Sequence, residues 1–183
     1  MKTLIIIGLL ITSYTAKAPI LRVKENPEIG KILLKIDHLT EGSRPSNQKI
    51  AELIWNASRK HKIEPDILTA LFMVESTFDQ TKVSKTGDMG IGQINPGIWK
   101  EEFLRRGLKP LDVKRLQSDT HYAVDRTAEI LSLLKKAGYK NYYGVYHSKT
   151  KELRRVYTKR IQKQLVKIQK FEEKHSLVVF NKP

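Results

Sequence analysis

One acidic side chain has neighbours that suit proton transfer. Glu75 follows an almost wholly apolar run, residues 67–74, and a helix with that pattern is expected to lie inside its domain. Burial and the negative end of the helix dipole would both raise the pKa of such a carboxyl group. A carboxylic acid that keeps its proton near neutral pH can act as a general acid. The alternative is a glutamate that only caps the helix or pairs with a lysine.

A polar, glycine-containing segment follows this acid. Residues 87–96 read GDMGIGQINP, and their three glycines allow a close approach of backbone to backbone or to a ligand. The segment fits neither phosphate-binding glycine pattern, because no Lys-Ser/Thr follows it and no strand precedes it. Gln93 and Asn95 offer the amide groups that sugars and peptides bind. Trp99 offers a flat apolar face on which a sugar ring can stack.

Together these residues resemble the lytic transglycosylase domain, the soluble-transglycosylase branch of the lysozyme-like superfamily. The resemblance covers residues 46–161. It is carried by Glu75-Ser76, Gly87-x-x-Gly90-Ile91-x-Gln93 and Tyr146. The Gln-Ile-Asn form of residues 93–95 is similar to the small exported transglycosylases associated with secretion and conjugation machines.

The resemblance implies cleavage of peptidoglycan glycan strands by a single acid, without a cofactor. Glu75 would protonate the β-1,4 glycosidic oxygen between N-acetylmuramic acid and N-acetylglucosamine. Its carboxylate would then take the proton of the muramoyl C6 hydroxyl, which attacks the anomeric carbon and leaves a 1,6-anhydro end. Most glycosidases need a second carboxylate. The only acids between Glu75 and Trp99 are Asp79 and Asp88, in a segment that looks exposed.

The resemblance also implies roles for other residues. Ser76 would position the substrate or hold the loop, Gln93 and Asn95 would line the cleft, and Tyr146 would place its hydroxyl near Glu75 and help set its protonation state. Three departures from the family pattern stand out. They are His147-Ser148-Lys149 after the tyrosine instead of Asn-x-Gly, Gly92 instead of methionine, and Asp88 instead of alanine.

Helical periodicity dominates the chain, and the expected fold is mainly α and lysozyme-like, α+β at most with little strand. Apolar residues at helical spacing predict helices at residues 47–60, 65–76, 96–106 and 119–137, and a last helix from Thr150. Leu153, Tyr157, Ile161, Leu165 and Ile168 form the apolar stripe of that last helix. Residues 32–39 fit either a strand or a short helix. We expect a single globular domain with a long basic C-terminal helix.

The N-terminus predicts export. A basic start, the apolar residues 4–11 and Ala16-Lys17-Ala18 are typical of a signal peptide. Pro19 after the cleavage position leaves an uncleaved N-terminal anchor as the alternative. We therefore expect a signal or anchor at 1–18, an N-terminal segment or linker at 19–45, the catalytic domain at 46–161, and a basic helix extension and tail at 162–183. The expected location is the periplasm or cell envelope, with secretion as the alternative.

The charge is strongly positive and uneven. The 183 residues carry a formal net charge of +15, and residues 149–174 hold ten Lys or Arg against three Glu. Such a field suits an anionic wall polymer or an anionic membrane, although a solvated helix face would have the same composition. No cysteine is present, which excludes thiol chemistry. His121 and Asp125 match no metal-binding motif and are expected to be surface residues, so no metal is expected.

Three alternatives remain beside the transglycosylase. The first is a hydrolytic muramidase, which would leave reducing ends instead of anhydro ends. The second is a catalytically silent wall-binding or assembly module, which would not need Glu75. The third is a basic exported protein that binds DNA; no nucleic-acid partner is expected, because no recognition helix stands out and the glycine segment would be unexplained.

Overall fold

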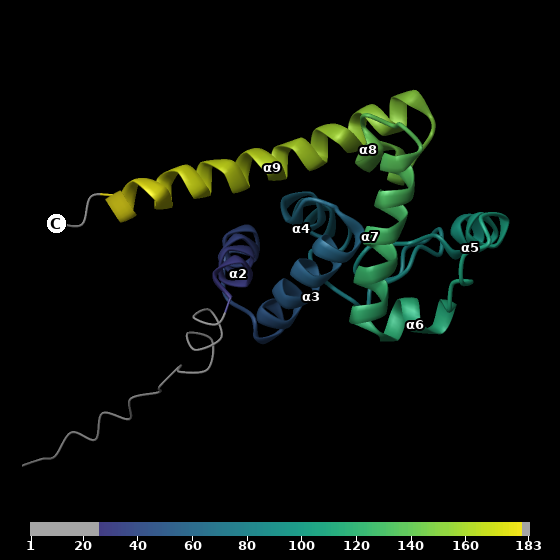
Figure 1. The fold of residues 1–183 in the computed structure, drawn as a ribbon, viewed down its shortest axis with the longest axis horizontal. Coiled ribbons are helices and arrows are strands. Elements are labelled where there is room, and N and C mark those ends of the chain that lie inside the picture. The colour runs from purple at the N-terminus through teal and green to yellow at the C-terminus, as the bar shows by residue number, and fades with distance from the viewer. Residues whose placement is uncertain (1–25, 181–183) are drawn as a thin grey trace, which may run out of the picture.

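The computed structural model describes residues 26–180, with side chains to residue 175. Within these residues the protein is mainly α, as expected, and the only extended pairing is two isolated bridges that join Met89 to Val83 and Ile94. The helices (Figure 1) are α2 (Pro27–Leu39), α3 (Pro45–His61), α4 (Pro65–Glu75), α5 (Pro96–Arg105), α6 (Val113–Ser118), α7 (Thr120–Lys136), α8 (Tyr142–His147) and α9 (Lys151–Phe180).

Local sequence signals set the helix ends. Proline occupies the first turn of α3, α4 and α5, where its missing N–H costs nothing. The side chain of Asn95 caps α5 by accepting a hydrogen bond from the Ile98 amide, 3.2 Å away. Gly138 follows α7 with φ of +84°, the left-handed conformation in which glycine ends helices.

Helix α4 lies inside the molecule. It packs against α2, α3 and α9, and Leu68, Leu71 and Phe72 are fully buried. Its apolar side chains are therefore buried on nearly every side, and this agrees with a sequence that shows no clear polar face on this helix. The prediction of an internal helix that ends at Glu75 is confirmed.

Helix α2 shares this core. Residues 27–39 were expected to belong to an N-terminal segment or linker, yet Ile32, Ile36 and Leu39 are buried against α3, α4 and α9. Buried Lys35 forms ion pairs with Asp66 of α4 at 2.7 Å and Glu172 of α9 at 2.6 Å. We therefore propose that the folded unit begins at α2 and not near Ser46. The expected signal or anchor at 1–18 lies outside the described residues.

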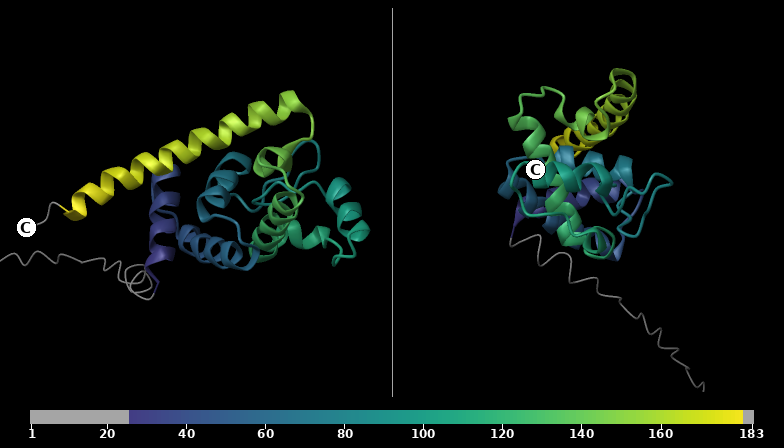
Figure 2. Two further views of the ribbon diagram at one scale, coloured as in Figure 1. Left: turned by 45° about the horizontal axis from the view of Figure 1, so that its top comes forward. Right: turned by 90° about the vertical axis from the view of Figure 1, so that its right-hand side faces the viewer.

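Helix α9 crosses one side of the molecule. It packs on α8, α4 and α2 in turn, and its C-terminal end extends past α2 in two views (Figures 1 and 2). Tyr157, Ile161 and Ile168 face the core as predicted, but Leu153 is 54 % exposed. The stripe starts one turn later than expected because the first turn of α9 lies beyond the surface of α4 and borders the cleft described below. No helix in the described part is long and apolar enough to cross a membrane.

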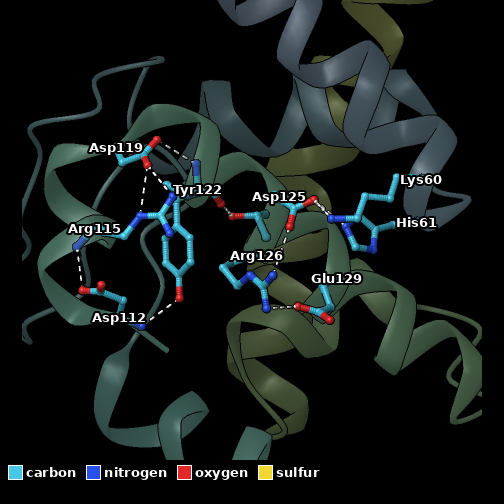
Figure 3. A network of polar contacts seen from close by, with 11 residues as sticks. Lys60, His61, Asp112, Arg115, Asp119, Tyr122, Asp125, Arg126 and Glu129 are labelled. Atoms are coloured by element: carbon cyan, nitrogen blue, oxygen red, sulfur yellow. Dashed lines mark hydrogen bonds and ion pairs between the residues drawn. The ribbon is translucent and has the colours of Figure 1, made fainter. Parts of the chain in front are cut away.

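A polar network fixes α7 against α3 (Figure 3). The carboxylate of Asp125 accepts hydrogen bonds from Lys60 at 2.7 Å and from His61 at 2.8 Å, and Arg126 bridges Asp125 and Glu129. Asp125 is thus not the surface residue that was expected beside His121. These ion pairs hold α7 in position, and α7 in turn packs against the glycine-containing loop.

Candidate active site

A cleft of about 890 Å³ opens beside the C-terminal end of α4. Its walls come from the polar segment after α4, from α5, from α8 and from the first turns of α9. The residues that bear on its chemistry are Glu75, Asp88, Gln93, Tyr146, His147 and Arg160. Asn95 also lines it, and so does an edge of Trp99, which is only 9 % exposed and belongs to the core. Residues far apart in the sequence thus meet at one cavity of the size that small ligands and sugar units occupy.

Glu75 is the last residue of α4, and the backbone reverses immediately after it. Thr77 and Phe78 have φ of +55° and +63°, an uncommon conformation for residues with a side chain. Two basic side chains donate hydrogen bonds to backbone carbonyl groups at this helix end. Lys82 donates to the Glu75 carbonyl, and Arg160 donates to the Val74 carbonyl at 3.3 Å. The negative end of the helix dipole, which was expected to act on Glu75, is therefore partly neutralised.

Tyr157 of α9 holds the Glu75 side chain. Its hydroxyl donates a hydrogen bond to Oε1 of Glu75 across 2.5 Å. Burial raises the pKa of Tyr157 well above 10, and the nearby carboxylate adds to the effect, so the hydroxyl remains a donor. The His147 ring stacks on the Tyr157 ring with centroids 4.5 Å apart and planes 6° apart, which fixes the direction of the hydroxyl.

The electrostatics keep Glu75 protonated near neutral pH. The pKa of Glu75 is raised from 4.5 to about 7, mainly by burial and to a lesser extent by the charge of Asp88. The hydrogen bond from Tyr157 and the charges of Arg160 and Lys82 act in the opposite direction. Desolvation is the largest cause, as predicted from the apolar run before the acid.

The glycine-containing loop packs too closely for side chains at two positions. A Cβ atom on Gly90 would lie 2.1 Å from the Leu116 carbonyl oxygen, and one on Gly92 would lie 2.0 Å from Oγ1 of Thr127. Thr127 of α7 thus occupies the space that a side chain at position 92 would need. The expectation of close backbone approach is confirmed, and it applies to the protein interior.

Ser76 holds this loop. It is 4 % exposed and donates from Oγ to the Ile91 carbonyl at 2.8 Å. It is absent from the residues that line the cleft. Of the two roles expected for Ser76, the geometry favours holding the loop over positioning the substrate, because a buried hydroxyl already bonded to backbone has no access to a sugar.

Gln93 and Asn95 both lie in the cleft wall, but they differ in how many of their side-chain polar atoms are already hydrogen-bonded. Gln93 donates from Nε2 to the carbonyls of Lys82 and Gly90, at 2.9 and 3.0 Å. Within the described residues its Oε1 makes no hydrogen bond, so this oxygen can accept one from a substrate. Asn95 uses both polar atoms internally, because Nδ2 donates to Asp88 at 2.7 Å while Oδ1 caps α5.

Tyr146 lies in the cleft wall, but it does not hold the acid. Its buried hydroxyl donates to the Gly92 carbonyl at 2.6 Å. Burial raises the pKa of Tyr146, and so does the charge of Glu75. The expected contact with Glu75 is thus electrostatic, and the direct hydrogen bond belongs to Tyr157, which the sequence reading placed only in the apolar stripe of α9.

Asp88 is closer to the chemistry than the sequence suggested. It is half-buried and lines the cleft, whereas Asp79 is exposed and bonds to Thr81. Both carboxylate oxygens of Asp88 are occupied, since Ser84 and Thr86 donate to Oδ2 at 2.8 Å and Asn95 donates to Oδ1. The lone pairs of this carboxylate are thus largely engaged inside the protein.

Comparison with known proteins agrees with this geometry. A family model described as the transglycosylase SLT domain matches residues 52–155, more than half of the chain. The match includes Glu75, the glycine-containing loop and Tyr146, and ends just before Tyr157. A comparison with curated protein sequences gave no match. The chain belongs to the transglycosylase SLT domain family, which has a mainly α, lysozyme-like fold and acts on peptidoglycan.

Proposed function

We propose that this protein is a peptidoglycan lytic transglycosylase that produces 1,6-anhydromuramoyl ends. One observation carries the proposal: among the carboxyl groups that line the cleft, Glu75 has a pKa raised to about 7 and is held by a tyrosine. A protonated acid in a shielded site is what the first step, protonation of a glycosidic oxygen, requires.

The two oxygens of Glu75 would have different tasks. Oε1 accepts the Tyr157 hydrogen bond, while Oε2 has no hydrogen-bond partner among the described residues. Oε2 would therefore carry the proton to the glycosidic oxygen between N-acetylmuramic acid and N-acetylglucosamine. The C1–O bond breaks, its electron pair leaves with the protonated oxygen, and Tyr157 stabilises the carboxylate that remains.

The second step closes a ring within the muramoyl unit. The C6 hydroxyl attacks C1 and gives its proton to the Glu75 carboxylate, which restores the acid. The product is a 1,6-anhydro sugar, and no water is consumed. Because the nucleophile belongs to the same sugar, its proximity replaces the second carboxylate that other glycosidases use.

A hydrolytic muramidase is the first alternative, and it would need a second carboxylate in the cleft. Among the described residues, the other carboxylates that line the cleft are Asp88 and Glu102. Glu102 is paired with Arg105 and Arg106, so Asp88 is the one that could activate water. Its oxygens already accept three hydrogen bonds from the protein, which leaves little room to bind and orient a water molecule, and this favours the internal attack. A catalytically silent wall-binding module is the other alternative, and a raised glutamate pKa in a cleft has no use in such a module.

Product analysis tests the proposal. Purified sacculi are digested with the wild type and with Glu75→Gln, and the fragments are identified by mass spectrometry. The wild type should release muramoyl ends lighter by one water than reducing ends. Glu75→Gln should lose at least about 1000-fold in rate, the upper part of the range for a general acid, and still bind sacculi. Reducing ends would support the muramidase, and equal rates would remove Glu75 from the mechanism.

We also propose that the protein works in the cell envelope after export. The N-terminal sequence supports this, since the apolar residues 4–11 and the Ala-x-Ala site fit a signal peptide. The Gln-Ile-Asn motif at 93–95 supports service to a secretion or conjugation apparatus, where local opening of the wall would be needed. Fractionation of cells that express the full chain would test the location: recovery in the cytoplasm contradicts it.

A further inference from the structure

Six basic residues follow one line along α9. They recur every three or four positions and are exposed, and we call them the basic stripe. The stripe consists of Arg155, Lys159, Lys163, Lys167, Lys170 and Lys174. At 3.6 residues per turn this spacing keeps all six on one face, over a length of roughly 29 Å.

The opposite face of α9 is fixed to the protein. Tyr157, Ile161 and Ile168 are at most 1 % exposed. Farther along, Glu172 pairs with Lys35, and Phe171 stacks on His38 with ring centroids 4.7 Å apart. The stripe therefore belongs to a helix held over most of its length, and its six side chains point away from the core on a preformed surface.

The stripe has no internal partners. Lys35, Lys60 and Lys135 each pair with a carboxylate of another helix or its cap. By contrast, none of the six stripe residues forms an ion pair or a side-chain hydrogen bond within residues 26–175. Glu152 and Glu173 lie on the same outward face near its two ends, so the face keeps a net positive charge.

Two valines interrupt the charge. Val156 and Val166 are 56 % and 49 % exposed and lie on the outward side of α9. Contact with water does not stabilise exposed apolar side chains on a cationic helix. On the surface of a bilayer they can enter the boundary between headgroups and acyl chains, while lysines beside them contact lipid phosphates.

We propose that the basic stripe docks on a membrane surface rich in anionic phospholipid. The complementary charge provides the attraction, and the exposed valines favour a lipid layer over a polar polymer. Shape points the same way: the stripe is a convex ridge that a plane can touch along its length, whereas proteins that bind nucleic-acid strands without sequence preference use a cationic groove. Anionic leaflets attract basic segments that lie within a Debye length of the surface.

This docking would leave the cleft open. Leu153 and Arg160 line the cleft, and they lie roughly a quarter turn around α9 from the centre of the stripe. The cleft would then face sideways along the membrane, toward the wall layer next to it. The inference concerns a surface separate from Glu75 and does not depend on the proposed reaction.

Vesicle co-sedimentation of the full chain tests this proposal. The stripe variant is Lys159→Gln/Lys163→Gln/Lys167→Gln. The matched control is Lys109→Gln/Lys114→Gln/Lys136→Gln, which removes the same charge from three exposed lysines elsewhere whose ammonium groups form no ion pair or hydrogen bond within residues 26–175. Vesicles consist either of equal parts phosphatidylcholine and phosphatidylglycerol or of phosphatidylcholine alone, which measures any contribution of the apolar residues 4–11. Thermal unfolding of all three proteins verifies that they fold.

The wild type should bind the anionic vesicles more tightly than the neutral ones, and added salt should weaken this binding. The stripe variant should lose roughly 100-fold in affinity for the anionic vesicles, since each basic residue near such a surface changes affinity about fivefold. The control should change little. Equal binding to both vesicles, equal losses in both variants, or stripe-dependent binding to duplex DNA with no binding to vesicles would overturn the proposal.

Discussion

The hydroxyl of Tyr157 donates a hydrogen bond to Oε1 of Glu75 across 2.5 Å, joining α9 to the end of α4. This contact orients the acid and stabilises its ionised form, while burial favours the protonated form. The two effects together give a carboxyl group that can lose and regain a proton near pH 7. A general acid that later acts as a base needs this balance.

Removal of the tyrosine hydroxyl should shift the pH profile. In Tyr157→Phe the pKa of Glu75 should rise above 7, because a hydrogen bond that lowers it is lost. Since the protonated acid starts the reaction, the alkaline limb of kcat/KM should move to higher pH, and kcat should fall about tenfold through poorer positioning. The matched control is Tyr143→Phe, in which the tyrosine hydroxyl has no hydrogen-bond partner in the described residues. An unchanged alkaline limb in Tyr157→Phe would show that this contact does not tune the acid.

Removal of the Asp88 charge should shift the profile in the other direction. The negative charge of Asp88 raises the pKa of Glu75, so in Asp88→Asn the alkaline limb should move to lower pH. The products should still carry anhydro ends, because Asp88 has no role as a base in the proposed reaction. Measured pH profiles and mass spectra of the products decide the point. Loss of cleavage with a normally folded protein would favour the hydrolytic alternative.

Replacement of the acid should stabilise the protein at neutral pH. The pKa of Glu75 is raised in the folded state, so its stabilising effect is full below pH 4.5 and is lost as pH rises through about 7. Above pH 7 the buried charge therefore costs about 3 kcal/mol, and Glu75→Gln removes this cost. Thermal unfolding should show Tm raised by roughly 6–12 °C at pH 8 and little change at pH 4. A lower Tm at pH 8 would contradict the buried ionisable acid.

The contact between Gly92 and Thr127 should appear as coupling between two substitutions. Gly92→Ala should destabilise the fold by about 1–3 kcal/mol, because its Cβ would overlap Oγ1 of Thr127. In Gly92→Ala/Thr127→Ala the overlap is relieved, so the double variant should be more stable than the sum of the single changes predicts. Denaturant unfolding of all four proteins measures the coupling. Strict additivity would show that the two residues do not meet.

Much of this fold was predictable because its signals are local. Apolar spacing located α3, α4, α5 and α7 to within a few residues, and capping residues explained their ends. Helix α2 was harder, because its apolar face is buried against α3, α4 and the far half of α9, and no local pattern shows that packing. Short α6 and α8 carry too few turns for periodicity to detect.

The acid was predictable, but its immediate partner was not. An apolar run before Glu75 indicated burial, and burial is the main cause of its raised pKa. The periodicity of α9 placed Tyr157 on the inward face, yet several residues share that face. Only the crossing of α9 over α4 decides that Tyr157 meets the acid. A buried tyrosine in an otherwise aliphatic stripe was the one sequence signal that pointed to it.

The most direct test of the account is the titration of Glu75 itself. Carboxyl carbons of glutamate can be followed by NMR across the pH range, and the Glu75 resonance is assigned by its absence in Glu75→Gln. We expect an apparent pKa of about 7 for this group. A value near 4.5, the ordinary value for glutamate, would mean that Glu75 is ionised at neutral pH and would contradict its role as the proton donor.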